Sequence, residues 1–221
     1  MKVLVVTSTP NKEGLTAACG ESARQGVVDG NSRARVINLN ESRIERCATC
    51  NNGWGSCLSE HSCVLKDDFE ELRGVFQAAE AYAWITPVYF GQPSEAFKAF
   101  FDRLRRCEST RPNKSESILA GKPVVAIAAA GGSGNGAVQC LSEMERLVKQ
   151  LGAESFDYVA ITQKTREYQL ETIHDALSAM CTRREEKAKA QEKRSMPLSA
   201  RRKSRPRRGR KRRPKEAAAR S

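Results

Sequence analysis

The stretch MKVLVVTSTPNKEGLT, residues 1–16, gives the clearest indication of how this chain folds. Residues 2–7 are a short run rich in β-branched side chains, which predicts a buried strand. A loop with several hydroxyl groups follows, and residues 15–28 then have the apolar spacing of a helix. A strand, a polar turn and a helix in this order are the first unit of a parallel α/β sheet.

The same alternation of strand and helix continues to about residue 182. Further strands are expected at residues 35–39, 81–88, 123–130 and 155–161, and further helices at residues 67–79, 95–107, 137–151 and 168–181. Asp67 and Asp68 would favour the start of their helix, because acidic side chains are stabilising at a helix N-terminus. Runs such as VLVV and VVAIAA are apolar on both faces, as in a parallel sheet covered on two sides. Residues 1–182 are therefore predicted to form one doubly wound α/β domain with five parallel strands.

Composition limits where this chain works. Apolar residues make up 39% of the 221 residues, enough for a real core. The N-terminus lacks the long apolar segment of a secretion signal, and no apolar run approaches membrane-spanning length. We therefore expect a cytoplasmic location without membrane contact, where clustered cysteines serve as metal ligands or redox groups more often than as a disulfide framework.

The positive charge of the chain is confined to its C-terminal end. The whole chain carries a formal net charge of +12, but residues 183–221 hold eighteen Lys and Arg against four Asp and Glu, so residues 1–182 carry a net charge of −2. The end of this tail has almost no side chain that could be buried, so it is expected to be mostly disordered, while its first residues could continue the last helix. Two interpretations stay open: weak, salt-dependent binding to nucleic acid or an acidic surface, and a solvated extension without a partner.

The loop after the first strand has the composition of a phosphate cradle. Hydroxyl groups at Ser8, Thr9 and Thr16 and the amide of Asn11 are neutral hydrogen-bonding groups, and Gly14 would let backbone N–H groups converge at a helix N-terminus. The loop is neither a Walker loop nor a dinucleotide fingerprint. It suits a single phosphate monoester, with an ordinary capped turn as the alternative.

Two further loops lie where the same sheet edge is expected. In TPVYFGQPSEAF, which begins at Thr86, the aromatic Tyr89 and Phe90 stand between Pro87 and Gly91. In AAGGSGNGA, residues 129–137, four glycines leave a backbone almost without side chains, as expected where a flat ring approaches the main chain. Because ligands of such sheets bind beyond the carboxyl ends of the strands, the three loops together predict a site for a planar, phosphate-bearing cofactor.

Four cysteines lie within the seventeen residues CATCNNGWGSCLSEHSC. Cys47, Cys50, Cys57 and Cys63 have the spacing C-x2-C-x6-C-x5-C and are the candidate metal ligands. Four thiolates suit a [4Fe–4S] cluster or tetrahedral zinc; a reversible disulfide and unligated structural cysteines are the other interpretations that stay open. His61 could replace one ligand, although a lone loop histidine is more often solvated. The other four cysteines fall on expected helices and are predicted to be buried small apolar groups: Cys19, Cys107, Cys140 and Cys181.

These motifs together resemble those of the flavodoxin-like NAD(P)H-dependent FMN reductases, including the iron-sulfur flavoprotein branch, over about residues 1–181. Members carry a Ser-Pro-Arg-x-x-Gly-x-Thr loop after the first strand. This chain matches it with Thr9, Pro10, Asn11, Gly14 and Thr16, and Asn11 stands where Arg is usual.

Three more motifs carry the resemblance. Members have a Pro-x-Tyr loop beneath the flavin, matched by residues 87–89, and a Gly-rich loop after the fourth strand, matched by residues 131–134. Many also have a Cys segment that ends in Lys-Asp-Asp, matched by CVLKDDF at residues 63–69. The iron-sulfur flavoproteins use a compact C-x2-C-x2-C, whereas here Gly53 holds the third position and Cys57 follows four residues later.

The resemblance implies a flavodoxin-like sheet with strand order 2-1-3-4-5 and FMN as the cofactor. It implies that the phosphate contacts Thr9, Asn11, Gly14, Leu15 and Thr16, and that the ring lies near Thr86, Pro87, Val88, Tyr89, Phe90 and Gly91 and near Gly131, Gly132, Ser133 and Gly134. The flavin ring would supply the chemistry, so no catalytic acid or base is expected.

Three functions follow as hypotheses. The first is an FMN-dependent oxidoreductase that passes electrons from NAD(P)H to flavin, quinone or a similar acceptor, in a homo-oligomer as the resemblance implies. The second is an iron-sulfur flavoprotein that exchanges electrons with a protein partner without using NAD(P)H. The third is a redox-sensing protein that binds nucleic acid through its tail.

Overall fold

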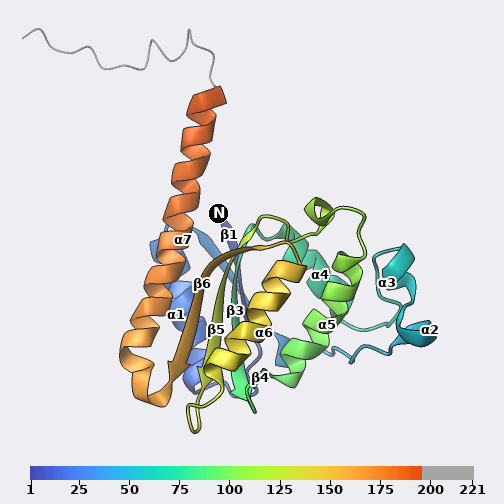
Figure 1. The fold of residues 1–221 in the computed structure, drawn as a ribbon. Helices are drawn as coiled ribbons and strands as arrows, with labels where there is room; N and C mark the ends of the chain where they lie inside the picture. Colours follow the sequence, from blue (N-terminus) through green and yellow to red (C-terminus); the bar gives the residue numbers. More distant parts are fainter. Residues whose placement is uncertain (196–221) are drawn as a thin grey trace, which may run out of the picture. The chain divides into compact units, whose positions relative to one another are not determined.

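A central parallel sheet organises the protein. The computed structural model describes the backbone of residues 1–195 and the side chains of residues 1–184, and the chain divides into two units, Met1–Arg184 and Glu185–Ser221. The first unit contains the sheet, whose five parallel strands run in the order β2-β1-β3-β5-β6 (Figure 1). The strands are β1 (Lys2–Thr7), β2 (Arg33–Asn38), β3 (Ala81–Tyr89), β5 (Pro123–Ala130) and β6 (Glu154–Thr162), and the two-residue β4 (Gln92–Pro93) pairs antiparallel with the end of β3.

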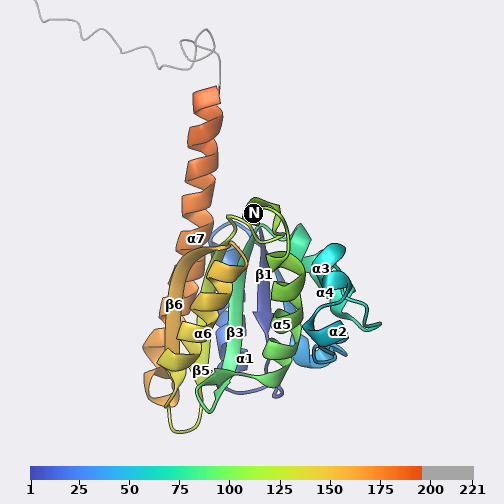
Figure 2. The same ribbon diagram turned by 45° about the vertical axis from the view of Figure 1, so that its right-hand side comes forward.

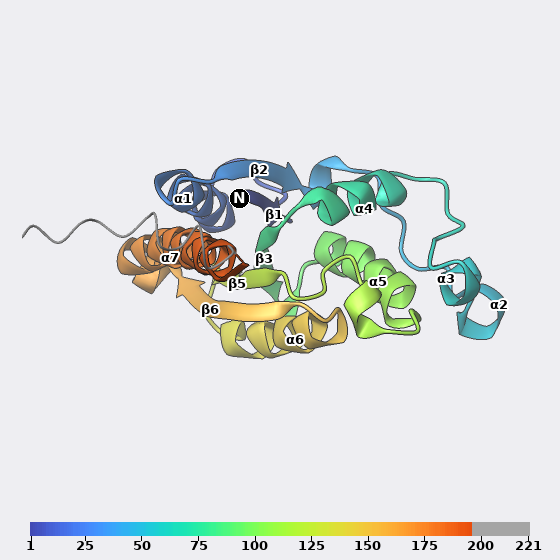
Figure 3. The same cartoon turned by 90° about the horizontal axis from the view of Figure 1, so that it is seen from above.

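Helices cover the sheet on both faces. Helix α1 (Leu15–Asp29) and residues 166–181 of α7 (Arg166–Ser195) pack on one face. Helices α4 (Phe69–Ala78), α5 (Glu95–Ser109) and α6 (Ala137–Gln150) pack on the other, as the view along the layers in Figure 3 shows. Short 3₁₀ turns stand at η1 (Leu39–Glu41), η2 (Lys114–Glu116) and η3 (Gln163–Thr165). The predicted doubly wound, flavodoxin-like α/β fold and its strand order are thereby confirmed, with β4 added as a short hairpin arm.

Side chains of the central strands alternate between two cores. In β1, Val3 and Val5 pack beneath α1 and α7, whereas Leu4 and Val6 pack beneath α4, α5 and α6. This alternation is the two-residue period of a strand with apolar residues on both faces. The second core is aromatic, and the rings of Trp84 on β3 and Phe101 on α5 lie 4.6 Å apart between their centroids.

One predicted boundary is wrong in an informative way. The helix expected from residue 67 begins at Phe69, because the Asp67 carboxylate binds Arg103 on α5 and Asp68 is the N-cap residue, without a side-chain cap. The expected acidic start is present: Asp67 also accepts from the Phe69 N–H at 3.2 Å, and Glu70 and Glu71 lie in the first turn. The last helix, expected at residues 168–181, spans Arg166–Ser195.

The cysteine segment, residues 47–63, lies beside α5 on the α4 side of the sheet and contains two single-turn helices, α2 (Cys50–Gly53) and α3 (Ser56–Ser59) (Figure 2). It is an insertion between β2 and α4. The predicted disorder of the basic tail concerns mainly residues 196–221, which lie outside the described part of the chain. Within the described part, no helix combines the length and apolar character needed to cross a membrane.

Candidate flavin site and cysteine cavity

Three loops meet at the carboxyl edge of the sheet, as the sequence predicts. Ser8, at the end of β1, donates a hydrogen bond from its hydroxyl to the Thr86 hydroxyl of β3 at 3.1 Å. The loop before α6 packs against the β3–β4 turn so closely that a Cβ atom on Gly136 would lie 2.7 Å from the Gly91 Cα. The segments predicted to bind one cofactor are thus neighbours in space.

The loop after β1 presents an open helix N-terminus. Gly14 is the N-cap of α1, has φ +136° and makes no side-chain cap, and a Cβ there would meet no atom within 4 Å. The first N–H groups of α1 have no partner within the helix, and its first turn carries no acidic residue. Backbone donors and the helix dipole together make this end of α1 suited to an anion.

Side chains of the same loop have two different roles. Thr9 shapes the loop, because its hydroxyl donates to the Asn11 carbonyl at 3.0 Å and accepts from the Asn11 N–H at 3.3 Å. The Thr16 side chain is buried and has no hydrogen-bond partner among the described residues. Its hydroxyl, the exposed Asn11 amide and the exposed Lys12 ammonium group are therefore side-chain donors that remain available to a ligand.

A buried hydroxyl cluster that the sequence did not reveal joins two of the loops. The Ser94 hydroxyl donates to the Ser8 hydroxyl at 2.9 Å, and the Ser94 N–H donates to the Thr86 hydroxyl at 3.0 Å. All three side chains are buried. The hydrogen bonds of the cluster connect the end of β1, the end of β3 and the start of α5, and so fix these loops in place.

The β3–β4 turn holds an aromatic ring in solvent. Phe90 and Gly91 are its two central residues, with φ of +51° and +77°, the signs that a type I′ hairpin turn requires. Phe90 is fully exposed, and Tyr89 before it is partly exposed. A positive φ is unusual for a bulky aromatic residue, so the local backbone is strained.

The Gly-rich loop leaves space next to this aromatic turn. A Cβ atom on Gly131 or Gly132 would meet nothing within 4 Å, and Ser133 is exposed. Gly134 and Gly136 have φ near +80°, which keeps the loop close to β6 and to the turn. The edge of the sheet therefore offers anion donors at α1, bare backbone and exposed aromatic surface. These features fit a molecule with a phosphate and a flat ring system.

All four predicted cysteine ligands line one small cavity of about 20 Å³, room for one or two water molecules. Cys107 of α5 forms part of its wall, and burial raises the pKa of that thiol to about 12, so it stays neutral. Within the described residues, however, no three His, Cys, Asp or Glu side chains converge closely enough to hold a metal ion. The four thiols are a donor set that suits a metal held by thiolates, and in this structure they share the wall of the cavity without converging on one point.

His61 is not part of this cavity. One of its ring nitrogens is hydrogen-bonded to the Thr110 hydroxyl at 3.0 Å, and its carbonyl accepts from Arg73 at 2.7 Å. The expectation of a simply solvated histidine is therefore wrong. The other predictions for cysteines hold: Cys19, Cys107, Cys140 and Cys181 are all buried.

Two arginines of α5 that the sequence did not single out also line the cysteine cavity. Arg103 is almost completely buried, whereas Arg106 stacks on the Trp54 ring and donates to the Gly53 carbonyl. Arg103, Arg106 and Cys107 lie on neighbouring positions of one helix. Their spacing could have indicated a shared site only if the face that α5 turns toward the insertion had been known.

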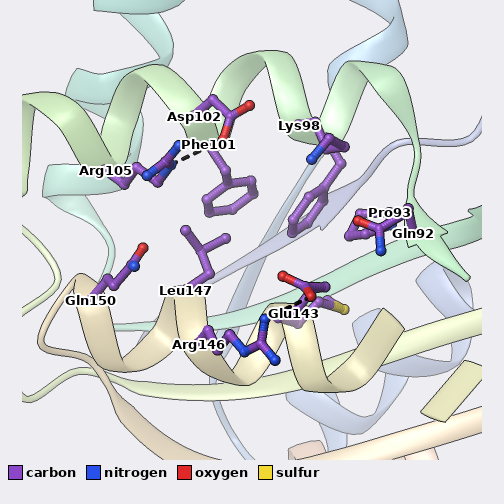
Figure 4. Close-up of a pocket in the computed structure, with 12 residues that line it drawn as sticks. Gln92, Pro93, Lys98, Phe101, Asp102, Arg105, Glu143, Arg146, Leu147 and Gln150 are labelled. Carbon is purple, nitrogen blue, oxygen red and sulfur yellow. Dashed lines mark hydrogen bonds and ion pairs between the residues drawn. The ribbon is translucent and has the colours of Figure 1, made fainter. Parts of the chain in front are cut away.

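A separate groove of about 300 Å³ runs between α5 and α6 (Figure 4). Phe101 and Leu147 point into it from the two helices, and charged side chains form its rim. Most of these charges are paired along their own helices, Arg105 with Asp102 at 3.0 Å and Arg146 with Glu143 at 2.9 Å. The groove reaches β4, and so adjoins the aromatic turn without being part of the three-loop site.

Comparison with known proteins agrees with this arrangement. Residues 1–166, which include all three loops and the cysteine segment, match the family model described as NADPH-dependent FMN reductase. The chain belongs to the NADPH-dependent FMN reductase family.

Relatives of this FMN reductase family member include proteins named iron-sulfur flavoprotein. One from Archaeoglobus fulgidus is 25% identical over 104 residues, which is 47% of this chain and 46% of the relative. One from Methanocaldococcus jannaschii is 29% identical over 105 residues, which is 48% of this chain and 52% of the relative. The chain thus spans about half the length of these two relatives.

Solved structures support the fold. RosB, determined with a bound riboflavin-phosphate intermediate, is 13% identical with a TM-score of 0.65, over 99% of this chain and 100% of RosB. An archaeal flavodoxin is 17% identical with a TM-score of 0.53, over 83% of this chain and 98% of the flavodoxin. At these identities the likeness shows a flavodoxin-like fold alone.

Proposed function

We propose that this protein is an FMN-dependent oxidoreductase that passes electrons from NAD(P)H to a flavin, a quinone or a similar acceptor. The observation that carries the proposal is the meeting of three loops at one sheet edge, where an open helix N-terminus lies near bare glycine backbone and an exposed aromatic turn. Family membership over residues 1–166 supports FMN as the group that these loops hold.

In this proposal the chain binds and orients the cofactor. The N-terminus of α1, from Gly14 and Leu15 to the buried Thr16 hydroxyl, holds the phosphate, with Thr9 shaping the loop and Asn11 at its rim. The ring lies against the backbone of residues 86–91 and 131–134. FMN would supply a ring that accepts a hydride from a nicotinamide and passes electrons to the acceptor. The hydroxyl cluster of Ser8, Thr86 and Ser94 keeps the first two loops in register.

The test is flavin binding followed by turnover. Purified full-length protein is reconstituted with FMN, freed of excess cofactor, and assayed for oxidation of NADH and of NADPH with a quinone or free FMN as acceptor. We expect about one FMN per chain and turnover that depends on it. Absence of bound FMN would overturn the proposed cofactor. Bound FMN without oxidation of either NADH or NADPH would overturn the proposed enzymatic activity and would favour an electron carrier.

A matched pair of variants locates the phosphate. Thr16→Val keeps the side-chain shape and removes the free hydroxyl, and should weaken FMN binding by about tenfold, the effect of one hydrogen bond to a charged group. Thr172→Val removes the Thr172 hydroxyl on α7, which is exposed and donates to the Tyr168 carbonyl. It should leave FMN binding unchanged. Equal affinity in both variants would place the phosphate elsewhere.

The cysteine cavity favours a second candidate, an iron-sulfur flavoprotein that exchanges electrons with a protein partner. One cavity is lined by Cys47, Cys50, Cys57 and Cys63, and none of these four forms a disulfide. Protein prepared without oxygen is assayed for iron, acid-labile sulfide and zinc. Iron and sulfide near the content of one cluster would support the carrier; zinc alone would make the site structural; neither metal would leave a reductase with free thiols.

A further inference from the structure

One buried ion pair ties the two ends of the cysteine segment to α5. Arg103 donates to both carboxylate oxygens of Asp67, at 2.5 and 2.9 Å, and to the Glu45 carbonyl at 3.1 Å. The Asp67 carboxylate in turn accepts from the Glu45 N–H at 2.7 Å. Glu45 lies two residues before Cys47 and Asp67 four residues after Cys63, so a single guanidinium fixes both ends of the insertion.

The same guanidinium lines the cysteine cavity and has one donor to spare. Arg103 is 1% exposed, and its Nε–H is buried without a hydrogen-bond partner among the described residues. The guanidinium also faces the Cys63 side chain. A buried donor without a partner costs free energy, and a metal-bound thiolate in the cavity would be a stronger acceptor for it than a neutral thiol.

The segment between the fixed ends is strained. Four of the six non-glycine residues with positive φ in the described part of the chain lie within it: Thr49, Asn51, Asn52 and His61. Asparagine tolerates this conformation, but a β-branched threonine does so poorly. Such backbone persists only where surrounding contacts impose it. The ion pair at the base of the segment is the deepest of those contacts.

We propose that Arg103 is the positioning residue of the cysteine cavity. Its paired donors hold the ends of the segment together, and its free Nε–H donates to a thiolate sulfur of a metal centre bound there, with the Cys63 sulfur that the guanidinium faces as the expected acceptor. The ligand class is a metal ion or cluster held by thiolates, which carries negative charge that a guanidinium stabilises. The inference rests on the proposed metal-binding role of the cysteines and is independent of flavin turnover.

A contribution to stability does not by itself explain why Arg103 and Asp67 form a buried ion pair. A buried ion pair is often no more stabilising than apolar residues of the same volume, because both charges lose their hydration. Lysine could keep the charge, but its ammonium group cannot bridge two carboxylate oxygens and a carbonyl in one plane. The planar guanidinium of arginine is therefore the group that can hold both ends of the segment at once.

The first measurement is amide hydrogen exchange of the metal-free, full-length protein. Arg103→Met and Arg103→Lys should both raise exchange of peptides covering residues 46–66 by at least about tenfold, while peptides from β3 and β5 stay protected. Arg105→Met is the matched control, because Arg105 lies on the same helix, pairs with Asp102 and does not line the cysteine cavity. It should change exchange less than about threefold. Unchanged exchange in the Arg103 variants, or an equal effect of Arg105→Met, overturns the positioning role.

Asp67→Asn provides a second test of the proposal if the Arg103 variants do not fold. Its amide keeps the shape and can still accept from the Glu45 N–H, but it cannot form the ion pair. We expect exchange in residues 46–66 to rise by about three- to tenfold in a protein with native secondary structure. Wild-type exchange in this variant would contradict the proposal.

The second measurement uses Co²⁺ as the probe, with thiolate-to-cobalt absorption recorded without oxygen. Wild-type protein should bind Co²⁺, and Arg103→Lys should bind it about 10- to 100-fold more weakly, the usual effect of losing a group that orients metal ligands. Equal affinity overturns the donor role of the Nε–H. Wild-type protein that binds no Co²⁺ overturns the metal site and that donor role together, while the exchange data still decide the positioning role.

Discussion

Phe90 combines a left-handed backbone with a fully exposed ring, so stability did not determine its side chain. The first central position of a type I′ turn favours asparagine, which tolerates positive φ. Phe90→Asn should therefore stabilise the protein by about 0.5–1 kcal/mol, or about 1–4 °C in Tm. Under the proposed function, loss of the ring beside the flavin should lower kcat/KM by about three- to tenfold, the effect of one aromatic contact.

Thermal unfolding and steady-state kinetics on the same preparation check both halves of the Phe90 prediction. Tyr168→Asn is the control, because Tyr168 is also an exposed aromatic residue but lies in the first turn of α7. It should change neither property appreciably. Higher stability with full activity in Phe90→Asn would show that the ring does not contact the reacting groups.

The buried hydroxyl cluster makes a second prediction at the residue scale. Ser94→Ala removes the N-cap of α5 and leaves the Ser8 and Thr86 hydroxyls with fewer partners. The free energy of unfolding should fall by about 1–3 kcal/mol, measured by urea denaturation. Ser59→Ala, at an exposed position of α3, should change it by less than about 0.5 kcal/mol. An equal change in the free energy of unfolding of both variants would mean that the hydroxyl cluster does not stabilise the fold.

At the scale of elements, α1 and α7 approach each other through a glycine. A Cβ atom on Gly26 would lie 2.2 Å from the His174 carbonyl oxygen, a backbone atom that cannot turn aside. Gly26→Ala should destabilise the protein by at least about 2 kcal/mol despite the better helix propensity of alanine. Gly74→Ala on α4 meets no atom within 4 Å and should instead stabilise by about 0.5–1 kcal/mol. Chemical denaturation of both variants measures the contrast.

The same two helices are joined by a titratable contact. Hydrogen bonds with Asp29 and with Asp175 raise the pKa of His174 above its usual 6.5. The stabilisation is complete below about pH 6.5 and is lost as the pH rises through the raised pKa of the folded state. The wild-type Tm should therefore fall by about 1–2 °C more than that of His174→Gln between pH 6 and pH 8.5, since exposed pairs contribute little. Parallel Tm curves for the two proteins would contradict this linkage.

At the scale of the whole molecule, a bound cofactor should raise the free energy of unfolding and therefore the Tm. If the three loops bind FMN, a concentration of 100 times Kd should stabilise the folded state by about 2.7 kcal/mol, or about 5–11 °C in Tm. Riboflavin has the same ring without the phosphate, and at the same concentration should shift the Tm by less than half as much. Equal shifts would show that the α1 N-terminus contributes no phosphate binding.

The parts of the fold that the sequence predicted are those whose pattern is local. The strands at residues 2–7 and 123–130 were predicted to the residue, because strands buried on both faces are continuous apolar runs. The start of α4 was not, because Asp67 is held by an arginine 36 residues further along the chain. The candidate site divides in the same way. Its loops were visible as glycine and hydroxyl patterns, whereas the Ser94 cluster and the wall of the cysteine cavity depend on which helix faces meet.

The joined base of the cysteine segment has a consequence for how such a protein can be altered. Glu45 and Asp67 are hydrogen-bonded to each other, and the Asp68 N–H donates to the Arg43 carbonyl at 3.1 Å, so the chain leaves and re-enters the domain at the same place. We therefore expect the insertion to be exchangeable as a unit. Either a short turn or a longer redox module could join the two chain ends at its base. Neither exchange would require any strand of the sheet to move.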